Sequence, residues 1–308
     1  MRTATFPFTV GVVLFGSLMA ASSAIWIRFL PGVSPIVIGF IRVAGATVVL
    51  LPWFLRELGR QRPPWRAFRY SVLAGLALAL HFATWIASLS YTTVALSVLF
   101  VATHPMFVIA LSFGVLRMPV PRNQIIGAGV ALMGVLYIQW QNLGPGLPGN
   151  GLKDQAFGNL LALGGGFFAA IYLLFSQEAR KSLGTILHVE VTYGTAAVVL
   201  LLTALVLGQT PLPTGGEPWL YLVLLILVPT IGGHTLFNWG IRHLGATLVS
   251  LIGLLEPVES TLLALLFLGE GLPLHTLLGG IIILGGLTLA LWQPLRNRGA
   301  LRIPSDSP

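Results

Sequence analysis

Hydrophobic and polar positions follow one another along this chain in long blocks. Apolar stretches of about 20 residues, enough to cross the roughly 30 Å hydrocarbon core of a bilayer as a helix, are separated by short segments rich in charge, proline and glycine. The pattern predicts an all-α membrane protein. Its ten spans are expected at residues 8–28, 35–55, 68–90, 93–115, 122–140, 156–177, 185–208, 218–241, 246–268 and 275–294.

The two halves of the chain carry the same landmarks at a constant offset of 152 residues. The aligned landmarks are Pro105 with Pro257, Pro121 with Pro273, Gly127 with Gly279, and Gly134 with Gly286. We interpret the chain as a duplicated unit with five spans in each copy. Because five is odd, the copies enter the bilayer in opposite orientations, which is the inverted-repeat plan of many secondary transporters. The predicted organisation is a first repeat at 8–140, a linker at 141–155, a second repeat at 156–294 and a tail at 295–308.

The basic residues predict the orientation of these spans. If the N-terminus is cytoplasmic, fourteen of the 17 basic residues fall on the cytoplasmic side, as the positive-inside rule requires. Both termini are then cytoplasmic and the linker is periplasmic. The residues counted are Arg2, Arg56, Arg60, Arg62, Arg66, Arg69, Arg117, Arg122, Arg180, Lys181, Arg242, Arg296, Arg298 and Arg302. This asymmetry explains the net charge of +8 without a nucleic-acid partner.

Composition supports the membrane interpretation. Hydrophobic residues make up 56% of the chain and charged residues 8%, against about 25% charged in an ordinary soluble domain. Cysteine is absent, which excludes disulfides and thiolate metal sites. Residues 21–24 resemble a signal-peptidase site. Cleavage there would leave nine spans and break the repeat, so a retained first span is favoured.

Ionisable residues inside membrane spans are candidates for function because they are costly to bury. His104 precedes Pro105 in the fourth predicted span, and Glu256 precedes Pro257 at the equivalent place in the ninth, with Glu259 three residues on. Proline bends a helix and frees a carbonyl near mid-membrane. A desolvated carboxyl has a raised pKa and can exchange protons near neutral pH. Glu256 and Glu259 are therefore the predicted proton-coupling residues, the alternative being purely structural pairing.

Other polar residues share helical faces and predict a substrate cavity. His81 and Trp85 lie on one face of the third span, Phe100 and His104 on one face of the fourth, His234 and Asn238 one turn apart in the eighth, and Arg42 inside the second. Each has a structural alternative: packing for Trp85, a carbonyl partner for His104, solvation for His234 and ion pairing for Arg42. His188 and Glu190 are expected at the membrane interface. The predicted substrate-binding residues are His81, Trp85, Phe100, His104, Asn238 and Arg42.

Several sequence motifs typical of enzymes and metal sites are missing from the sequence. Neither lysine, Lys153 or Lys181, ends a phosphate-binding glycine loop. No histidine pair has metal-ligand spacing, and no serine lies in a nucleophile elbow. The sequence therefore predicts neither an enzyme nor a cofactor. The expected partners are a small-molecule metabolite, the lipid bilayer and protons, and the oligomeric state stays open.

The pattern resembles the EamA-type transporters of the drug/metabolite transporter superfamily. The matching features are two five-span halves, the mid-span prolines Pro105 and Pro257, the Pro35 to Arg42 segment, and the ending Leu268-Gly269-Glu270. The resemblance covers roughly residues 8–140 and 156–292. It implies a bacterial inner-membrane location and alternating access through a cavity lined by both halves, often for export of amino acids or other small metabolites.

One departure from this pattern stands in the first repeat. Leu116-Arg117-Met118 occupies the place of Leu268-Gly269-Glu270, so a basic residue replaces the glycine and the following acid is missing. The expected function is a proton-coupled secondary transporter that exports amino acids or similar metabolites. Uptake of a sugar or nucleoside-like solute and a non-transporting membrane scaffold are the alternatives. A polar mid-membrane cavity would favour transport, and a closed, fully packed interior would favour the scaffold.

Overall fold

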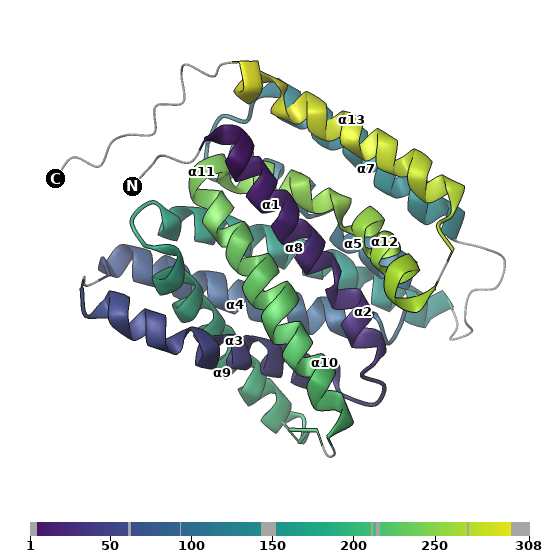
Figure 1. Ribbon diagram of the computed structural model, residues 1–308. Helices are drawn as coiled ribbons and strands as arrows, with labels where there is room; N and C mark the ends of the chain where they lie inside the picture. Colours follow the sequence, from purple (N-terminus) through teal and green to yellow (C-terminus); the bar gives the residue numbers. More distant parts are fainter. Residues whose placement is uncertain are drawn as a thin grey trace.

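The computed structural model describes residues 5–60, 63–92, 94–142, 152–210, 212–213, 216–269 and 271–296, and within these ranges every regular element is a helix (Figure 1). The predicted all-α class is confirmed for this part of the chain. In order, the elements are α1 (Phe6–Ala21), α2 (Ser23–Arg28), α3 (Pro35–Leu58), α4 (Trp65–Ser88), α5 (Val94–Val101), α6 (His104–Gly114), α7 (Arg122–Asn142), α8 (Leu152–Arg180), α9 (Thr185–Val206), α10 (Glu217–Leu225), η1 (Ile226–His234), α11 (Thr235–Ile252), η2 (Gly253–Leu255), α12 (Glu256–Leu268) and α13 (Leu274–Arg296).

Eight helical stretches of the described chain are long and apolar enough to cross a membrane. One of them, Pro218–Phe267, contains two of the predicted spans, and a shorter apolar helix, Arg122–Ile138, coincides with a third. The protein is therefore a multi-pass membrane protein. Helix α7 ends at Asn142 and α8 begins at Leu152, so both helices extend into the range 141–155 that was predicted as the linker. Residues 143–151 of that linker and 297–308 of the predicted tail lie outside the described ranges.

Helices break where proline was predicted to break them. Helix α5 ends at Val101 and α6 begins at His104, directly before Pro105. A 3-10 turn, η2, separates α11 from α12, which begins directly before Pro257. Both breaks follow from the missing proline N–H and from the clash of its ring with the preceding turn.

Two further irregularities lie in the second half and were not predicted. Element η1 is a nine-residue π-helix that contains Pro229. Gly245 has φ 80° and ψ 163°, and the chain turns there inside the single apolar stretch Pro218–Phe267. Glycine tolerates this backbone conformation because it has no Cβ. The Ala246 amide after the turn donates to the Gln177 side-chain oxygen of α8, at 2.6 Å.

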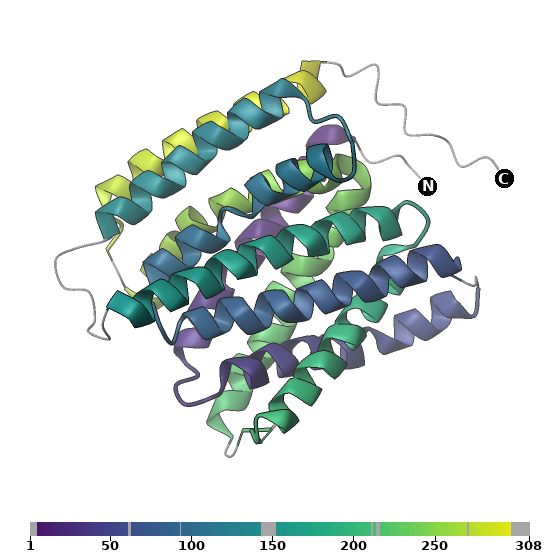
Figure 2. The same cartoon turned by 180° about the vertical axis from the view of Figure 1, so that it is seen from behind.

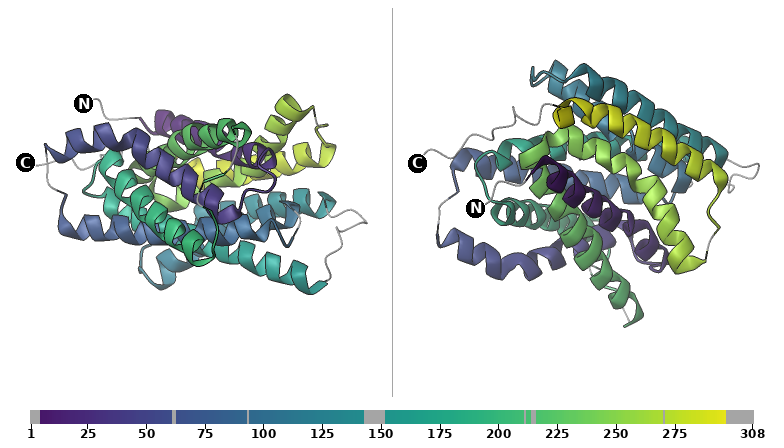
Figure 3. Two further views of the ribbon diagram at one scale, coloured as in Figure 1. Left: turned by 90° about the horizontal axis from the view of Figure 1, so that it is seen from below. Right: turned by 45° about the horizontal axis from the view of Figure 1, so that its top comes forward.

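Several contacts between the two halves of the chain come in pairs. Where a helix of the first half packs on a helix of the second, the helices at the equivalent positions in the other half also pack on each other. Helix α4 packs on α8, and correspondingly α1 packs on η1 and α11, while α3 packs on α9 and α7 on α13. The α7–α13 pair forms one edge of the bundle, as the two opposite views and the tilted view show (Figures 1, 2 and 3). A Cβ at Gly127 would lie 2.5 Å from the Gly286 carbonyl, and one at Gly134 would lie 2.7 Å from the Gly279 carbonyl. Glycine at these positions allows the two backbones to touch.

Candidate functional site: a polar cavity between the two halves

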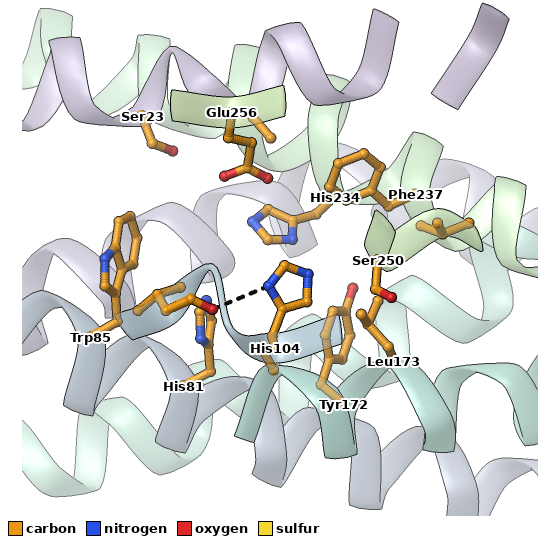
Figure 4. Close-up of a pocket in the computed structure, with 14 residues that line it drawn as sticks. Ser23, His81, Trp85, His104, Tyr172, Leu173, His234, Phe237, Ser250 and Glu256 are labelled. Carbon is orange, nitrogen blue, oxygen red and sulfur yellow. Dashed lines mark hydrogen bonds between the residues drawn. The ribbon is translucent and has the colours of Figure 1, made fainter. Parts of the chain in front are cut away.

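A cavity in the middle of the bundle is bounded by helices from both halves of the chain (Figure 4). It leaves about 80 Å³ open to water-sized molecules. One buried water needs roughly 10–15 Å³ of such space, so several waters fit. Alanine, leucine, valine and phenylalanine form its apolar wall. The other lining residues are Ser23, His81, Trp85, His104, Tyr172, His234, Ser250 and Glu256.

His81 and Trp85 form one wall, on α4. The His81 Nδ1 atom lies 2.9 Å from the Gly165 carbonyl oxygen of α8, and its ring stacks on Trp85 with centroids 5.7 Å apart and planes at 8°. The indole Nε1 of Trp85 is buried and has no hydrogen-bond partner within the described chain. An indole N–H can only donate. Trp85 therefore contributes the face of its ring to the cavity wall, while its N–H is buried without a partner in the described structure.

His104 and Glu256, which precede the two equivalent prolines, face the same space (Figure 4). His104 Nδ1 lies 3.2 Å from the Val101 carbonyl at the break between α5 and α6. A Cβ on Gly253 would lie 3.6 Å from both His104 Nε2 and Glu256 Oε1, so the two groups approach from opposite sides of one small gap. His104 thus combines a backbone carbonyl beside its Nδ1 atom with a place on the cavity wall.

His234, the last residue of the π-helix, also lines the cavity. Its ring meets the Phe82 ring edge-on at 5.5 Å and 88°, and its buried Nδ1 has no partner among the residues described. A π-turn inserts one extra residue into a helix. At the 152-residue offset the position equivalent to His81 is Gly233, one residue before His234. This histidine is visible in the sequence, but the π-helix that places it on the cavity wall was not predicted.

Arg42 lies just behind the wall and not on it. The side chain is fully buried, with Nε 3.1 Å from the Thr230 hydroxyl, Nη2 3.4 Å from the hydroxyl of the lining residue Ser23, and Cζ 4.3 Å from the centre of the Phe82 ring. Nη1 has no hydrogen-bond partner in the described structure. The arginine reaches the cavity only through Ser23.

Asn238 also lies behind the cavity, in a buried polar network. Its side-chain oxygen accepts from His188 Nε2 at 3.0 Å, and its amide nitrogen donates to the His234 carbonyl at 2.8 Å and to the Tyr172 hydroxyl. His188 Nδ1 in turn lies 2.9 Å from the Ser71 hydroxyl. His188 and Glu190, near the start of α9, are both buried inside the protein, with exposed fractions of 0% and 5%. The network ties α4, α8, α9 and α11 together.

Two other predicted site residues are absent from the cavity wall as described. Phe100 is half-buried near the end of α5, and its carbonyl accepts from the Thr103 hydroxyl at 2.6 Å. Glu259 lies one turn beyond Glu256, where its Oε2 accepts from the Ser17 hydroxyl of α1 at 2.6 Å. Thus of the predicted residues His81, Trp85, His104 and Glu256 meet in one place, whereas Arg42, Phe100, Asn238 and Glu259 surround it.

Sequence reasoning missed Tyr172, Ser23 and Ser250. Tyr172 stands among several phenylalanines in α8, so no local pattern marks it. In the described part of the chain, no group of three or more histidine or acidic residues has the geometry of a metal site. The cavity therefore presents hydrogen-bonding groups, one carboxyl and aromatic rings.

A multi-pass helical bundle with a polar cavity enclosed between its two halves is typical of membrane transporters. The model of the EamA-like transporter family matches residues 7–140 and 156–292. The chain belongs to this family.

Two of the similar proteins are named as transporters. An uncharacterized transporter of Archaeoglobus fulgidus is 26% identical over 91% of this chain and 95% of its own length. The uncharacterized transporter YwfM of Bacillus subtilis is 25% identical over 87% of this chain and 88% of its own, and the protein PecM of Dickeya dadantii is 26% identical over 85% and 84%. A solved crystal structure superimposes with a TM-score of 0.73 at 19% identity, covering 94% of this chain and 98% of the other, which supports the fold.

Proposed function

We propose that this protein is a proton-coupled secondary transporter of the inner membrane that exports amino acids or similar small metabolites by alternating access. The observation that carries the proposal is the cavity lined from both halves, in whose wall residues Trp85 and His234 have buried polar atoms that lack partners in the described structure. Leaving polar atoms unpaired inside a bilayer is costly. A water-filled or substrate-filled cavity removes that cost, and a packed scaffold does not.

The proposed architecture is ten spans as two inverted five-helix repeats, with the domain limits given by the sequence. Support comes from the paired helix contacts, in which α4 on α8 has its exchanged counterpart in α1 on η1 and α11. The seam of α7 and α13 has the same property: Gly127 meets Gly286, and their equivalents Gly279 and Gly134 meet each other. A two-fold axis produces such reciprocal contacts.

The proposed orientation places both termini and residues 56–69 in the cytoplasm and the linker outside. The start of α1, the end of α13 and the α3–α4 and α8–α9 junctions lie at one end of the bundle, which agrees with this orientation (Figures 1 and 2). Single cysteines at Arg60 and Lys153 in this cysteine-free chain test it. An impermeant thiol reagent should label them from opposite sides, and labelling from the same side would refute the topology.

Within the cavity we assign the substrate to His81, Trp85 and His104, with Arg42, Phe100 and Asn238 acting from behind the wall. Glu256, with Glu259 one turn away, is the proposed proton carrier. Glu256 lies in the cavity opposite His104, where protonation removes its charge and changes what the cavity can bind. A single site that binds proton and substrate in turn couples the two flows.

The test is transport by purified protein in vesicles of known orientation. Labelled amino acids are screened for efflux and for uptake, with and without a pH gradient. The proposal expects accumulation of at least one amino acid against its gradient when protons flow the other way. Facilitated uptake of sugars or nucleosides alone would replace the substrate assignment, and no transport of any tested solute would favour the scaffold.

A further inference from the structure

A second hollow lies away from the central cavity, in a groove bounded by α4, the end of α6 and α8. It leaves about 470 Å³ open to water-sized molecules. Leu111 of α6 and Ile171, Leu174 and Phe175 of α8 form apolar walls. Arg66, Tyr70, Glu178 and Lys181 line one end of it and also line an adjoining hollow of about 320 Å³. We call the whole feature the α4–α6–α8 groove.

The length of the groove matches one leaflet of a bilayer. On α8 its lining runs from Lys181 back to Ile171, and at 1.5 Å per residue this is about 15 Å. Half of a hydrocarbon core of roughly 30 Å is the same length. Trp65, 69% exposed and stacked on Phe68, stands at the charged end, as expected of an aromatic belt at the membrane surface.

The charged end of the groove is basic. Arg66 is exposed, with its Cζ 5.8 Å from the centre of the Tyr70 ring, and Lys181 is exposed beside Glu178, whose Oε1 lies 2.5 Å from Nζ. Arg117 stands between two lining residues, Leu116 and Met118. Three cations against one carboxylate leave a net positive mouth at an interface where phosphate groups of lipids lie.

The backbone at Arg117 gives an independent reason to assign it a function. Arg117 has φ 52°, the left-handed region that residues with a Cβ disfavour, and the Met118 amide fixes the turn by donating to the Ser112 carbonyl at 2.8 Å. The residue 152 positions later is Gly269, with φ 66° and a cap on the equivalent carbonyl of Ala264. The second repeat makes this turn without strain, whereas the first repeat keeps an arginine there. Strain of this kind points to a role for the side chain.

We propose that the α4–α6–α8 groove binds one anionic phospholipid, with its phosphate at Arg66, Arg117 and Lys181 and an acyl chain along Leu111, Ile171 and Leu174. Arginine suits this role because its planar fork binds phosphate oxygens in pairs. A soluble partner does not fit, because most of the groove lies beside membrane-spanning helix. The lipid belongs to the cytoplasmic leaflet if the orientation proposed above holds.

Lipid retention tests this site in the full-length protein, without substrate or a proton gradient. Purified protein is equilibrated in nanodiscs containing equal amounts of phosphatidylglycerol and phosphatidylcholine with the same acyl chains, and bound lipid is counted by native mass spectrometry. The wild type should retain the anionic lipid in preference. Arg66→Gln with Arg117→Gly should lower that preference about 25-fold, since each of the two basic residues near the surface contributes roughly a factor of five.

The matched control is Arg56→Gln with Arg60→Gln, two exposed cations at the same end of the bundle but outside the groove. This variant should keep the wild-type preference. Arg117→Gly also relieves strain, so in phosphatidylcholine alone the double variant should melt no lower than the wild type, which shows that it is folded. An unchanged preference in the Arg66/Arg117 variant, or an equal loss in the control, would overturn the site. A failed transport screen leaves this result untouched, and the cysteine at Arg60 reports separately on the leaflet.

Discussion

Two polar clusters lie side by side in the membrane interior of this protein, and they are built differently. In the buried network, His188, Asn238 and the Tyr172 hydroxyl satisfy one another through the distances described above. In the cavity, Trp85 Nε1 and His234 Nδ1 are buried without a partner in the described structure. Both clusters contain histidine, so residue type alone does not distinguish them.

The difference teaches that polarity inside a membrane is not in itself evidence of a binding site. A closed network holds helices together, because every group in it would be costly if it were unpaired. A cluster with unpaired groups around a void needs water or a ligand to complete it. The two clusters should therefore respond to mutation in different ways, one through stability and the other through transport.

The largest expected effect is on coupling at Glu256. Glu256→Gln keeps the shape of the protonated acid but cannot release a proton, so accumulation against a gradient should fall by at least about 100-fold, which corresponds to about 2.7 kcal/mol. Counterflow exchange of the same solute should persist. Both are measured in vesicles with and without a pH gradient.

Asp154→Asn is the control for that measurement, because Asp154 is an exposed carboxylate in the first turn of α8. Glu190, at first sight suitable, is 5% exposed and would disturb packing. If Glu256→Gln accumulates solute at the wild-type rate with an unchanged pH profile, the coupling role passes to Glu259 or His104.

The next effect separates the two clusters directly. Asn238→Leu removes the common partner of His188 and Tyr172 and should lower the free energy of unfolding by about 3 kcal/mol, since each buried group left unpaired costs about 1–3 kcal/mol. His234→Leu in the cavity should change it by less than about 1 kcal/mol while reducing transport. Thermal unfolding in detergent measures the first effect and vesicle transport the second. Equal losses of stability in both variants would break the distinction.

A smaller effect concerns the apolar contact between α7 and α13. Mutation of this contact, like mutation of the network, should change stability. Gly127→Ala forces a Cβ to within 2.5 Å of the Gly286 carbonyl and should destabilise the α7–α13 seam by about 2 kcal/mol. Gly129→Ala, on the same helix with nothing within 4 Å of its Cβ, should be neutral or slightly stabilising. Comparison of the two melting temperatures tests the close approach, and an equal response would argue against it.

Much of the fold could be predicted because membrane spans are read from long apolar runs and helix breaks from proline. Pro105 and Pro257 interrupt their helices where expected. The π-helix at Pro229 and the turn at Gly245 were not predicted, since neither residue alone forces these conformations. The turn depends on a tertiary partner, Gln177, which lies far away in the sequence.

For the candidate site, the sequence also carries part of the information. His104 and Glu256 were singled out because each precedes one of two prolines 152 residues apart, and both line the cavity. Asn238 was predicted on the cavity wall, but His188 encloses it from a neighbouring helix. His234 was considered with Asn238 but left out of the predicted substrate-binding residues, and it lines the cavity from the end of a π-helix that was not predicted.

The most direct test of the central claim, that the cavity is open to water and the surrounding network is not, uses two neighbouring positions. Ala169 lines the cavity, and Ala170, at the same depth on α8, is fully buried in packing. In this cysteine-free chain, Ala169→Cys and Ala170→Cys are treated with a small charged thiol reagent after reconstitution. We predict that cysteine at 169 reacts and that cysteine at 170 does not. Equal protection of both would mean a closed interior and would contradict the account.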